Sequence, residues 1–384
     1  MANKVKIHGL WGLVAKWFIK SQPPPPPPPP QPKLPILPND IIYDILLLLP
    51  AKSLARSRCV CREWNNLLTG LDFLKRHLDH CHHRLVLSSV SSSYYHMSMD
   101  LEAPGSFVLT ELDFPWKKRL QMIMGSCNGL LCILVGNNLF LWNPSTRKYK
   151  QLPPPSSCLK DYQLFYGFGY DESVDGYYNY KVVIGESYNI IEHGIRRSKL
   201  VEVYIRKTNS WRRIQDFPYN NVFRERGIFV NGFLHWFAMS DKDLCPTIAS
   251  LDLAKEEFGE VMLPDFLRRF LLVDLAVLNG MLCVMRNNNG VWDVHAMKEY
   301  GVPESWFVLV TIPSVVWTIA MPFVWTSIRM PLYLMKNGEL VMQISENKML
   351  ICDPRYGTTR NHIHTNFAIH DSDSVTYVES LESP

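Results

Sequence analysis

Five residues in the middle of the chain have the types and spacing of a reactive site. Gly125-Ser126-Cys127-Asn128-Gly129 fits the pattern G-x-C-x-G, a cysteine version of the nucleophile elbow of hydrolases. Such an elbow needs a strand before the nucleophile and a helix after it, whereas a β-type run follows Gly129. We therefore interpret Asn128-Gly129 as a tight turn between strands and expect no catalytic residue here.

A second group of residues has side chains that could bind a metal ion. The potential ligands in this stretch are His77, His80, Cys81, His82 and His83. Adjacent side chains diverge, and no second Cys or His pair follows at zinc-ribbon spacing. We expect these residues to be solvated, with no metal site and no cofactor.

The overall composition is that of a soluble globular protein. A chain of 384 residues that is 47% hydrophobic and 20% charged has room for a small module and one large domain. A net charge of +4 without a long basic run gives no reason to expect nucleic acid as a partner. The nine cysteines are scattered among apolar residues and no N-glycosylation sequon occurs, which favours the cytoplasm or the nucleus.

Residues 1–35 predict a leader and a spacer. Met1 to Lys20 is basic and interleaved with apolar residues, typical of an amphipathic or disordered leader. A signal or transit peptide is the alternative. The eight prolines Pro23 to Pro30 favour an extended helix of roughly 25 Å, which we interpret as a stiff spacer or as a ligand for a proline-recognising domain.

The stretch Leu37 to Leu78 predicts three short helices. The first starts near Asn39 or Asp40, repeats apolar residues at helical spacing and ends at Pro50. A second start follows at Ser53, and a third helical piece follows Arg62. About forty residues bury too little surface to be stable alone, so these apolar side chains need a partner surface. An ordinary helical core of the same chain is the alternative.

This stretch resembles an F-box. The matching residues are Leu37, Pro38, Asp40, Ile41, Ile45, Leu46, Leu49, Pro50, Lys52, Ser53, Leu54, Arg56, Cys59, Val60 and Trp64. The sequence departs from the family at Ser57, at Cys61, where Ser is usual, and at Leu47 and Leu48, which would broaden the apolar face. The resemblance implies docking on a Skp-type adaptor, which joins cullin and RING subunits in a ubiquitin ligase. The residues expected to bind the adaptor are Leu37, Pro38, Ile41, Ile45, Leu49, Pro50, Leu54, Val60, Trp64 and Leu67.

From about Leu85 the sequence predicts an all-β region with an internal repeat. Asn-Gly turns at Asn128, Asn231, Asn279 and Asn337 each precede a strand, at separations of about 50 residues or twice that. The double spacing predicts a degenerate repeat near Tyr166 to Val183. A period near 50 is typical of a β-propeller, here of about six blades, and a pair of β-sandwiches is the alternative.

Three further runs each close a strand in this pattern. They are Leu141-Trp142-Asn143-Pro144, Leu251-Asp252-Leu253 and Ile351-Cys352-Asp353-Pro354. The first two lead to Tyr149 and Phe258, which we expect to be aromatic residues of the outer strands.

The β region resembles the plant F-box-associated interaction domain, which is similar to kelch-type propellers. The motifs that carry the resemblance are Ser126 to Cys132, Tyr166 to Asp171, Lys181 to Val183, Asn231 to Trp236, Met297 to Val302 with Ser305 and Trp306, and Tyr377 to Leu381. The resemblance implies the substrate-recruiting half of a ligase subunit.

The run Trp306 to Ile328 carries no charged residue and approaches the length of a membrane span. Pro313 and Pro322 divide it, and β-branched and aromatic residues dominate, so we expect buried blade strands and no membrane association.

The sequence thus predicts an α+β multidomain chain: leader and spacer (1–35), three-helix F-box (36–80) and a propeller-like domain (85–384). The predicted function is that of a non-catalytic substrate receptor of an SCF-type ligase. The alternative is a propeller enzyme acting on a sugar or small molecule. The target is unknown; the loops expected to contact it are Pro153 to Asp161, Glu186 to Lys199 and Ser240 to Thr247.

Overall fold

The computed structural model describes residues 37–89, 96–102, 109–116, 120–156, 164–172, 176–186, 191–192, 195–196, 200–219, 222–240, 245–268, 272–288, 291–312, 331–345, 348–364 and 369–384. The predicted leader and spacer lie outside these residues. Contacts divide the chain into two compact units between Ile45 and Leu46. The helical residues that follow Leu46 therefore belong to the same unit as the β region.

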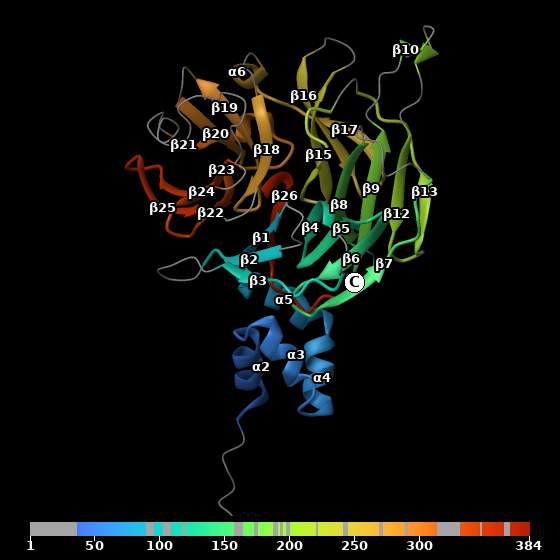
Figure 1. Cartoon of the computed structure of the whole chain (residues 1–384), viewed down its shortest axis with the longest axis vertical. Coiled ribbons are helices and arrows are strands. Elements are labelled where there is room, and N and C mark those ends of the chain that lie inside the picture. Colours follow the sequence, from blue (N-terminus) through green and yellow to red (C-terminus); the bar gives the residue numbers. More distant parts are fainter. Residues whose placement is uncertain are drawn as a thin grey trace, which may run out of the picture. The chain divides into compact units, whose positions relative to one another are not determined.

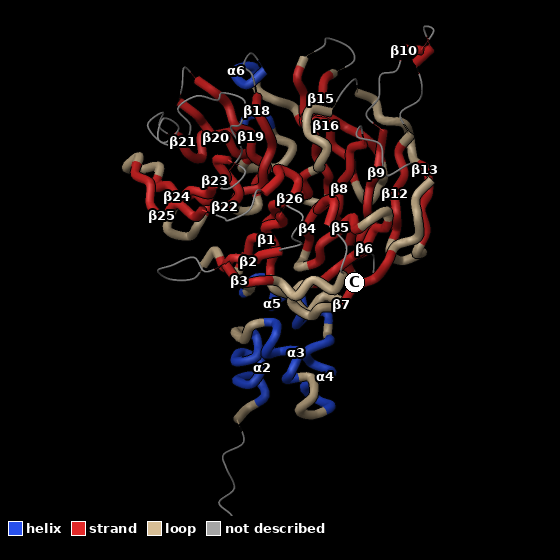
Figure 2. Tube along the Cα trace, viewed as in Figure 1, coloured by secondary structure: helices blue, strands red, loops and turns tan. Residues whose placement is uncertain are grey.

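Four described helices precede the β region. They are α2 (Asn39–Leu47), α3 (Ala51–Ser57), α4 (Arg62–Thr69) and α5 (Leu71–His80). The predicted start near Asn39 is confirmed, whereas α3 begins before the predicted Ser53. The third predicted piece is two helices, because Gly70 adopts an extended conformation with φ −67° and ψ 139°. Among the described residues, Figure 2 shows the longer helices in this part of the chain; the turn α6 (Asp265–Arg268) and a 3-10 turn at Pro303–Ser305 lie elsewhere.

Local hydrogen bonds fix the ends and neighbours of α3, α4 and α5. Cys61 is extended and its Sγ accepts a bond from the Trp64 amide at 3.4 Å, so the thiol replaces the usual serine cap. Arg58 Nη2 donates to the Leu68 carbonyl at 2.9 Å, which joins α3 to α4. His77 Nε2 lies 3.0 Å from the Leu49 carbonyl and thereby joins α5 to the segment between α2 and α3.

Six four-stranded antiparallel sheets form the blades of a β-propeller, as predicted. From the innermost strand outward, blade 1 consists of β26 (Ile369–Val378), β1 (His83–Ser89), β2 (His96–Asp100) and β3 (Leu109–Glu111). Blade 2 consists of β4 (Leu120–Cys127), β5 (Leu130–Val135), β6 (Asn138–Asn143) and β7 (Lys148–Gln151). Blade 3 consists of β8 (Leu164–Glu172), β9 (Tyr178–Glu186), β12 (Val201–Ile205) and β13 (Ser210–Arg213).

The remaining blades keep the same order. Blade 4 consists of β14 (Ile228–Val230), β15 (Phe233–Met239), β16 (Pro246–Asp252) and β17 (Glu257–Val261). Blade 5 consists of β18 (Leu272–Leu278), β19 (Met281–Asn288), β20 (Val291–Met297) and β21 (Trp306–Ile312). Blade 6 consists of β22 (Pro331–Leu334), β23 (Leu340–Ser345), β24 (Lys348–Asp353) and β25 (Thr358–His364). A separate two-stranded sheet is formed by β10 (Ile191–Glu192) and β11 (Ile195–Arg196), and a 3-10 turn, η1, spans Pro303–Ser305.

The predicted Asn-Gly turns join the first and second strands of blades 2, 4, 5 and 6. In three of them both residues have positive φ, for example 49° at Asn128 and 82° at Gly129. Only a residue pair that tolerates this left-handed backbone can make such a hairpin turn. The degenerate repeat predicted near Tyr166 to Val183 is confirmed as the strands β8 and β9 of blade 3.

The ring is closed by pairing the last strand with the first. β26 pairs antiparallel with β1, with His83 opposite Val378 and Val86 opposite Val375. Figure 1 shows the red strand β26 beside the cyan strand β1, although they come from opposite ends of the β region. The six innermost strands then contact one another around the ring in the order β26, β4, β8, β14, β18 and β22.

Apolar clusters among the described residues fill the spaces between neighbouring blades. In β1, Leu85 and Leu87 face blade 6 while Val86 faces blade 2, because successive side chains of a strand point to opposite faces. Each sheet is covered on both faces, so its inner strands are apolar nearly throughout, as in the fully buried β5. This explains why the sequence shows runs of apolar residues rather than clean alternation.

The uncharged run from Trp306 to Ile328 is only partly described. Residues 306–312 form β21, so the prediction of β structure is confirmed for them. The prediction that they are buried is confirmed only for Trp306 and Ile312. It is wrong for Phe307 and Val308, which are exposed because β21 is the outermost strand of blade 5. The rest of the run lies outside the described residues, and no helix in the described part of the chain is long and apolar enough to cross a membrane.

A buried ion cluster joins blades 3 and 4. The Lys181 Nζ lies 2.8 Å from both Asp171 Oδ2 and Glu256 Oε1, and it also donates to the Leu253 carbonyl. Arg212 Nη2 contacts the second oxygen of Glu256 at 2.6 Å. The Lys181 ammonium therefore holds two carboxylates from different blades in a site where its side chain is only 4% exposed.

Replacing Lys181 with Met should lower the free energy of unfolding by about 3–5 kcal/mol, because two buried carboxylates lose their shared cation. Urea denaturation measures this. The exposed Lys148 in β7 provides the control K148M, which should change stability by less than about 0.5 kcal/mol. Equal stability of the two variants would mean that the cluster does not join the blades.

A buried histidine joins blades 4 and 5. His235 Nε2 lies 2.6 Å from the Tyr300 hydroxyl, and Nδ1 lies 3.1 Å from the Ile228 carbonyl. The neutral ring can donate from Nδ1 and accept at Nε2, so both contacts are satisfied. Burial lowers the pKa of His235 to about 4. Two of the sequence motifs, around Asn231 and around Tyr300, thus meet at this contact.

This pKa makes stability depend on pH in one direction. The unfolded chain takes up a proton on His235 near pH 6.5 and the folded chain only near pH 4. The free energy of unfolding should therefore decrease as the pH is lowered from 6.5 to 4. The slope should be about 1.4 kcal/mol per pH unit for this group. In urea denaturation at pH 7, 6 and 5, H235Q should show a shallower decline than wild type, whereas H80Q, at an exposed histidine, should not.

Candidate functional site

The first described residues present large apolar side chains to solvent. Leu37, Ile41 and Ile45 are 51%, 45% and 47% exposed, and Pro38 is exposed as well. Ile41 and Ile45 are four residues apart in α2 and therefore share one face of the helix. An exposed apolar stripe of this kind is typical of a protein interface.

The predicted adaptor residues after Leu46 differ in exposure. Val60 is 64% exposed, Pro50 is exposed, and Leu49, Trp64 and Leu67 are partly buried. Leu54 has no exposed surface, so in this conformation it packs inside the chain and cannot contact a partner, contrary to the prediction. Leu48 is 74% exposed and was not among the predicted binding residues, although the sequence indicated that it broadens the apolar face.

The histidine and cysteine cluster is only partly solvated: His80 and His82 are exposed as expected, whereas His77 and Cys81 are not. His77 and Cys81 are buried and in contact with each other, with the Cys81 Sγ 3.3 Å from His77 Nδ1. Burial raises the pKa of Cys81 to about 12, so the group is a thiol at neutral pH. His82 and His83 lie beside Asp100 and Glu102. No metal-binding group of three ligands occurs in the part of the chain that the structure describes.

The G-x-C-x-G stretch forms a strand and a turn. Cys127 is the last residue of β4 and is buried, and the turn at Asn128 and Gly129 leads directly into β5. Burial raises the pKa of the Cys127 thiol well above its ordinary value. The geometry of a nucleophile elbow is therefore not formed, and the thiol is not activated.

The last residues of the chain connect α5 to the propeller. The buried Asn143 amide donates to the carbonyls of Ser380 at 3.1 Å and Glu382 at 2.7 Å. The carbonyl of Glu379 accepts from the Cys81 thiol, and its amide donates to the His82 carbonyl. The segment 379–382 thus bonds to blade 2 on one side and to the end of α5 on the other.

We call the propeller face that carries the Asn-Gly turns the turn face and the opposite one the loop face. α5 contacts the turn face, where Lys75 Nζ lies 3.2 Å from Glu172 Oε1 and over the Tyr178 ring. The loops predicted to contact a target join β7 to β8, β9 to β12 and β15 to β16. In antiparallel blades these connections all emerge on the loop face, although most of their residues lie outside the described part.

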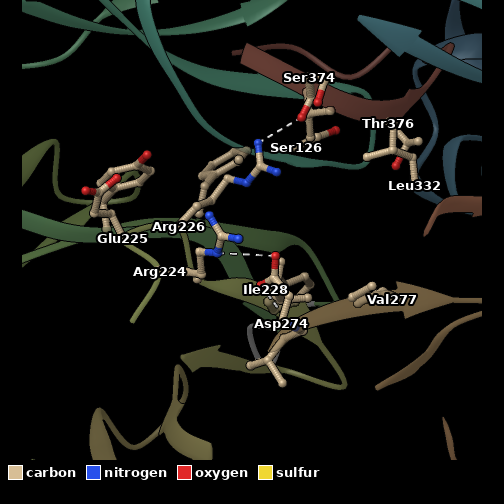
Figure 3. Close-up of a pocket in the computed structure, with 18 of the residues that line it drawn as sticks. Ser126, Arg224, Glu225, Arg226, Ile228, Asp274, Val277, Leu332, Ser374 and Thr376 are labelled. Atoms are coloured by element: carbon tan, nitrogen blue, oxygen red, sulfur yellow. Dashed lines mark hydrogen bonds and ion pairs between the residues drawn. The ribbon is translucent and has the colours of Figure 1, made fainter. Parts of the chain in front are cut away.

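A cavity of about 410 Å³ occupies the centre of the propeller (Figure 3). Residues from all six innermost strands line it, together with the segment that precedes β14. Its apolar wall includes Phe168, Leu275 and Leu332, and hydroxyl groups come from Ser126 and Thr376. A concave space that combines an apolar wall with converging polar groups is typical of a binding site.

Two arginines from the segment before β14 extend into this cavity. Arg226 Nη1 donates to the Ser374 carbonyl of β26 at 2.9 Å, and Arg224 Nε lies 3.5 Å from Asp274 Oδ2 of β18. Figure 3 shows these two contacts and shows the Glu225 side chain on the other side of the segment. The segment is held by Tyr166, whose amide donates to the Glu225 carbonyl at 2.8 Å and whose carbonyl accepts from the Gly227 amide at 2.7 Å.

Comparison with known families decides the identity of the chain. The family of the F-box associated beta propeller domain matches residues 84–383, and that of the F-box domain matches residues 34–76. The chain is an F-box protein with an F-box associated β-propeller domain. F-box proteins of this architecture are typical substrate adaptors of SCF ligases.

Plant relatives share most of the length of this F-box protein. The F-box protein At3g07870 of Arabidopsis thaliana is 32% identical over 369 residues, 84% of this chain and 86% of the relative. The F-box protein CPR1 of the same species is 32% identical over 304 residues, 72% of this chain and 73% of the relative. The F-box/kelch-repeat protein At3g23880 is 31% identical over 301 residues, 72% of this chain and 80% of the relative.

Sequence reasoning missed the charged residues of the cavity in this F-box protein. Arg224, Arg226 and Asp274 lie outside the repeated motifs, so no periodic signal marked them. The available signal was the alternation of charge in Arg224-Glu225-Arg226 immediately before a β-type run. The predicted adaptor residues, by contrast, came from a motif with a fixed spacing.

Proposed function

We propose that this F-box protein is the substrate-recognition subunit of an SCF-type ubiquitin ligase. Its F-box would dock on a Skp-type adaptor, which supplies the cullin and RING subunits, and its propeller would recruit a target protein. The observation that carries the proposal is the exposure of large apolar side chains within residues matched by the F-box family, Leu48 and Val60 among them.

Burial of these side chains provides the energy for adaptor binding. Fully removing a Leu, Ile or Val side chain from water contributes about 1.5–3 kcal/mol. Leu37, Ile41 and Ile45 before the division at residue 45, and Leu48 and Val60 after it, are available for this. Leu54, Leu46 and Leu68 are already buried and stabilise the helices instead.

The propeller supports binding rather than the alternative function of a sugar-acting enzyme. Such an enzyme needs convergent carboxylates, whereas the described cavity lining contains only Asp274, which is ion-paired to Arg224, and Glu225, whose side chain lies on the other side of its segment. The loop face offers the connections that receptors of this architecture vary to select a target. We therefore propose a non-catalytic receptor.

The compartment is a further part of the proposal. Seven cysteines in the described residues are free thiols: Cys59, Cys61, Cys81, Cys127, Cys132, Cys283 and Cys352. A chain with scattered free thiols suits a reducing compartment. We propose the cytoplasm or the nucleus, which a fluorescent fusion protein would test.

Replacing Leu48 and Val60 with Glu should abolish co-purification with a Skp-type adaptor, because both side chains are exposed in the F-box and would carry charge into an apolar interface. The dissociation constant measured by calorimetry should rise at least about 100-fold, the equivalent of about 2.7 kcal/mol. Y356E, at a 76% exposed side chain in a propeller turn, is the matched control and should bind normally. Retained binding of the double variant would contradict the proposed docking site.

The adaptor and target activities should separate in the same variant. An excess of L48E/V60E should bind the target without delivering it to the ligase, so the target's half-life should lengthen. Point substitutions are preferable to deleting Pro38 to Leu78, because α3, α4 and α5 belong to the same compact unit as the propeller. Target turnover is measured with wild type, L48E/V60E and Y356E; equal turnover with all three would count against a receptor role.

A further inference from the structure

The guanidinium of Arg226 is a positive charge without a carboxylate partner among the described residues. Its Nη1 donates to the Ser374 carbonyl at 2.9 Å, and this contact leaves its other N–H groups available on the cavity side. A cation in a partly enclosed space is poorly solvated, so it gains more from an anion than an exposed arginine does.

The groups around Arg226 favour a singly charged anion. Arg224 lines the same cavity, and Asp274 offsets part of its charge at 3.5 Å. Because the Glu225 side chain lies on the other side of its segment, Arg226 supplies an unpaired positive charge in the described lining. One such charge suits a carboxylate better than a doubly charged phosphate. The planar guanidinium matches the two oxygens of a carboxylate, and the hydroxyl groups of Ser126 and Thr376 can donate to the same group.

The size and wall of the cavity favour a side chain of a larger molecule. A volume of about 410 Å³ holds a few side chains but not a folded element. Ile228, Val277 and Leu332 offer apolar contacts for methylene groups next to the carboxylate. Arg224 and Asp274 lie near the starts of β14 and β18, at the loop-face end, where a target would approach.

We propose that the central cavity binds an acidic side chain of the target protein, with Arg226 as its carboxylate receptor. This inference rests on the proposed receptor function and names the chemistry that the propeller recognises: an extended segment of the target with a Glu or Asp side chain that enters from the loop face. Recognition of acidic segments by arginine clusters is a known mode of peptide binding.

The test uses the full chain bound to a Skp-type adaptor and two matched pools of fluorescent nine-residue peptides. Each pool has random flanks, with Glu fixed at the centre of one and Gln at the centre of the other. Fluorescence anisotropy should show at least about tenfold tighter binding of the Glu pool, about 1.4 kcal/mol. The preference should disappear in R226Q and persist in the control R355Q, at an exposed arginine in a propeller turn.

Arg226 also bonds to Ser374, so R226Q alone would not separate recognition from folding. The second variant is S126D, which adds a carboxylate to the cavity wall and keeps Arg226. S126D should retain the melting temperature of wild type and lose the preference for the Glu pool. A folded S126D that keeps the preference, or equal binding of both pools by wild type, would falsify the proposal.

Two further measurements distinguish the possible failures. Free glutarate should displace the fluorescent Glu pool at least tenfold more weakly than unlabelled peptides of the same pool do. Equal displacement would mean that the cavity binds a small free acid, which would overturn the proposal that its ligand is a side chain of a target protein. Co-purification with the adaptor is measured in the same samples. Intact adaptor binding without a Glu preference overturns only the cavity proposal, whereas loss of adaptor binding overturns the receptor function itself.

Discussion

The buried amide of Asn143 is the interaction on which the connection between the helices and the propeller depends. It donates to two carbonyls of the segment 379–382, while its oxygen accepts from the amide of Ser145 in its own turn. An unpaired buried amide costs about 1–3 kcal/mol, so this segment has one favoured position. Through Glu379 the same segment bonds to Cys81 and His82 at the end of α5. From Leu46 onward, the helices and the propeller are thereby built as one unit.

Local backbone chemistry is the part of this fold that sequence reasoning predicts well. The Asn-Gly turns were identified correctly because their positive φ angles restrict the residues allowed. The gap left by the missing Asn-Gly pair correctly indicated blade 3. The break at Gly70 was missed because the apolar spacing of α4 and α5 continues across it, and nothing in a periodic pattern reports that a glycine has left the helical conformation.

Contacts between distant residues are the part that the sequence did not reveal. His235 and Tyr300 each belong to a recognised motif, yet only the packing of blade 4 against blade 5 brings them to 2.6 Å. The buried Lys181 reads as an ordinary charged residue until Asp171 and Glu256 are placed around it. The cavity is the strongest example, because Arg226 reaches from the segment before β14 to Ser374 in the final strand. Such pairs follow from topology, which a single sequence specifies only indirectly.

The pairing of β26 with β1 also has a consequence for how the chain is made. During synthesis the helices and β1 leave the ribosome first, and the partner of β1 emerges only after five complete blades have been translated. Until then β1 has an unpaired edge, the kind of backbone that joins strands of other chains. A messenger truncated shortly before codon 369 would therefore yield a product with a permanently open ring that also lacks the segment 379–382, a species suited to aggregation.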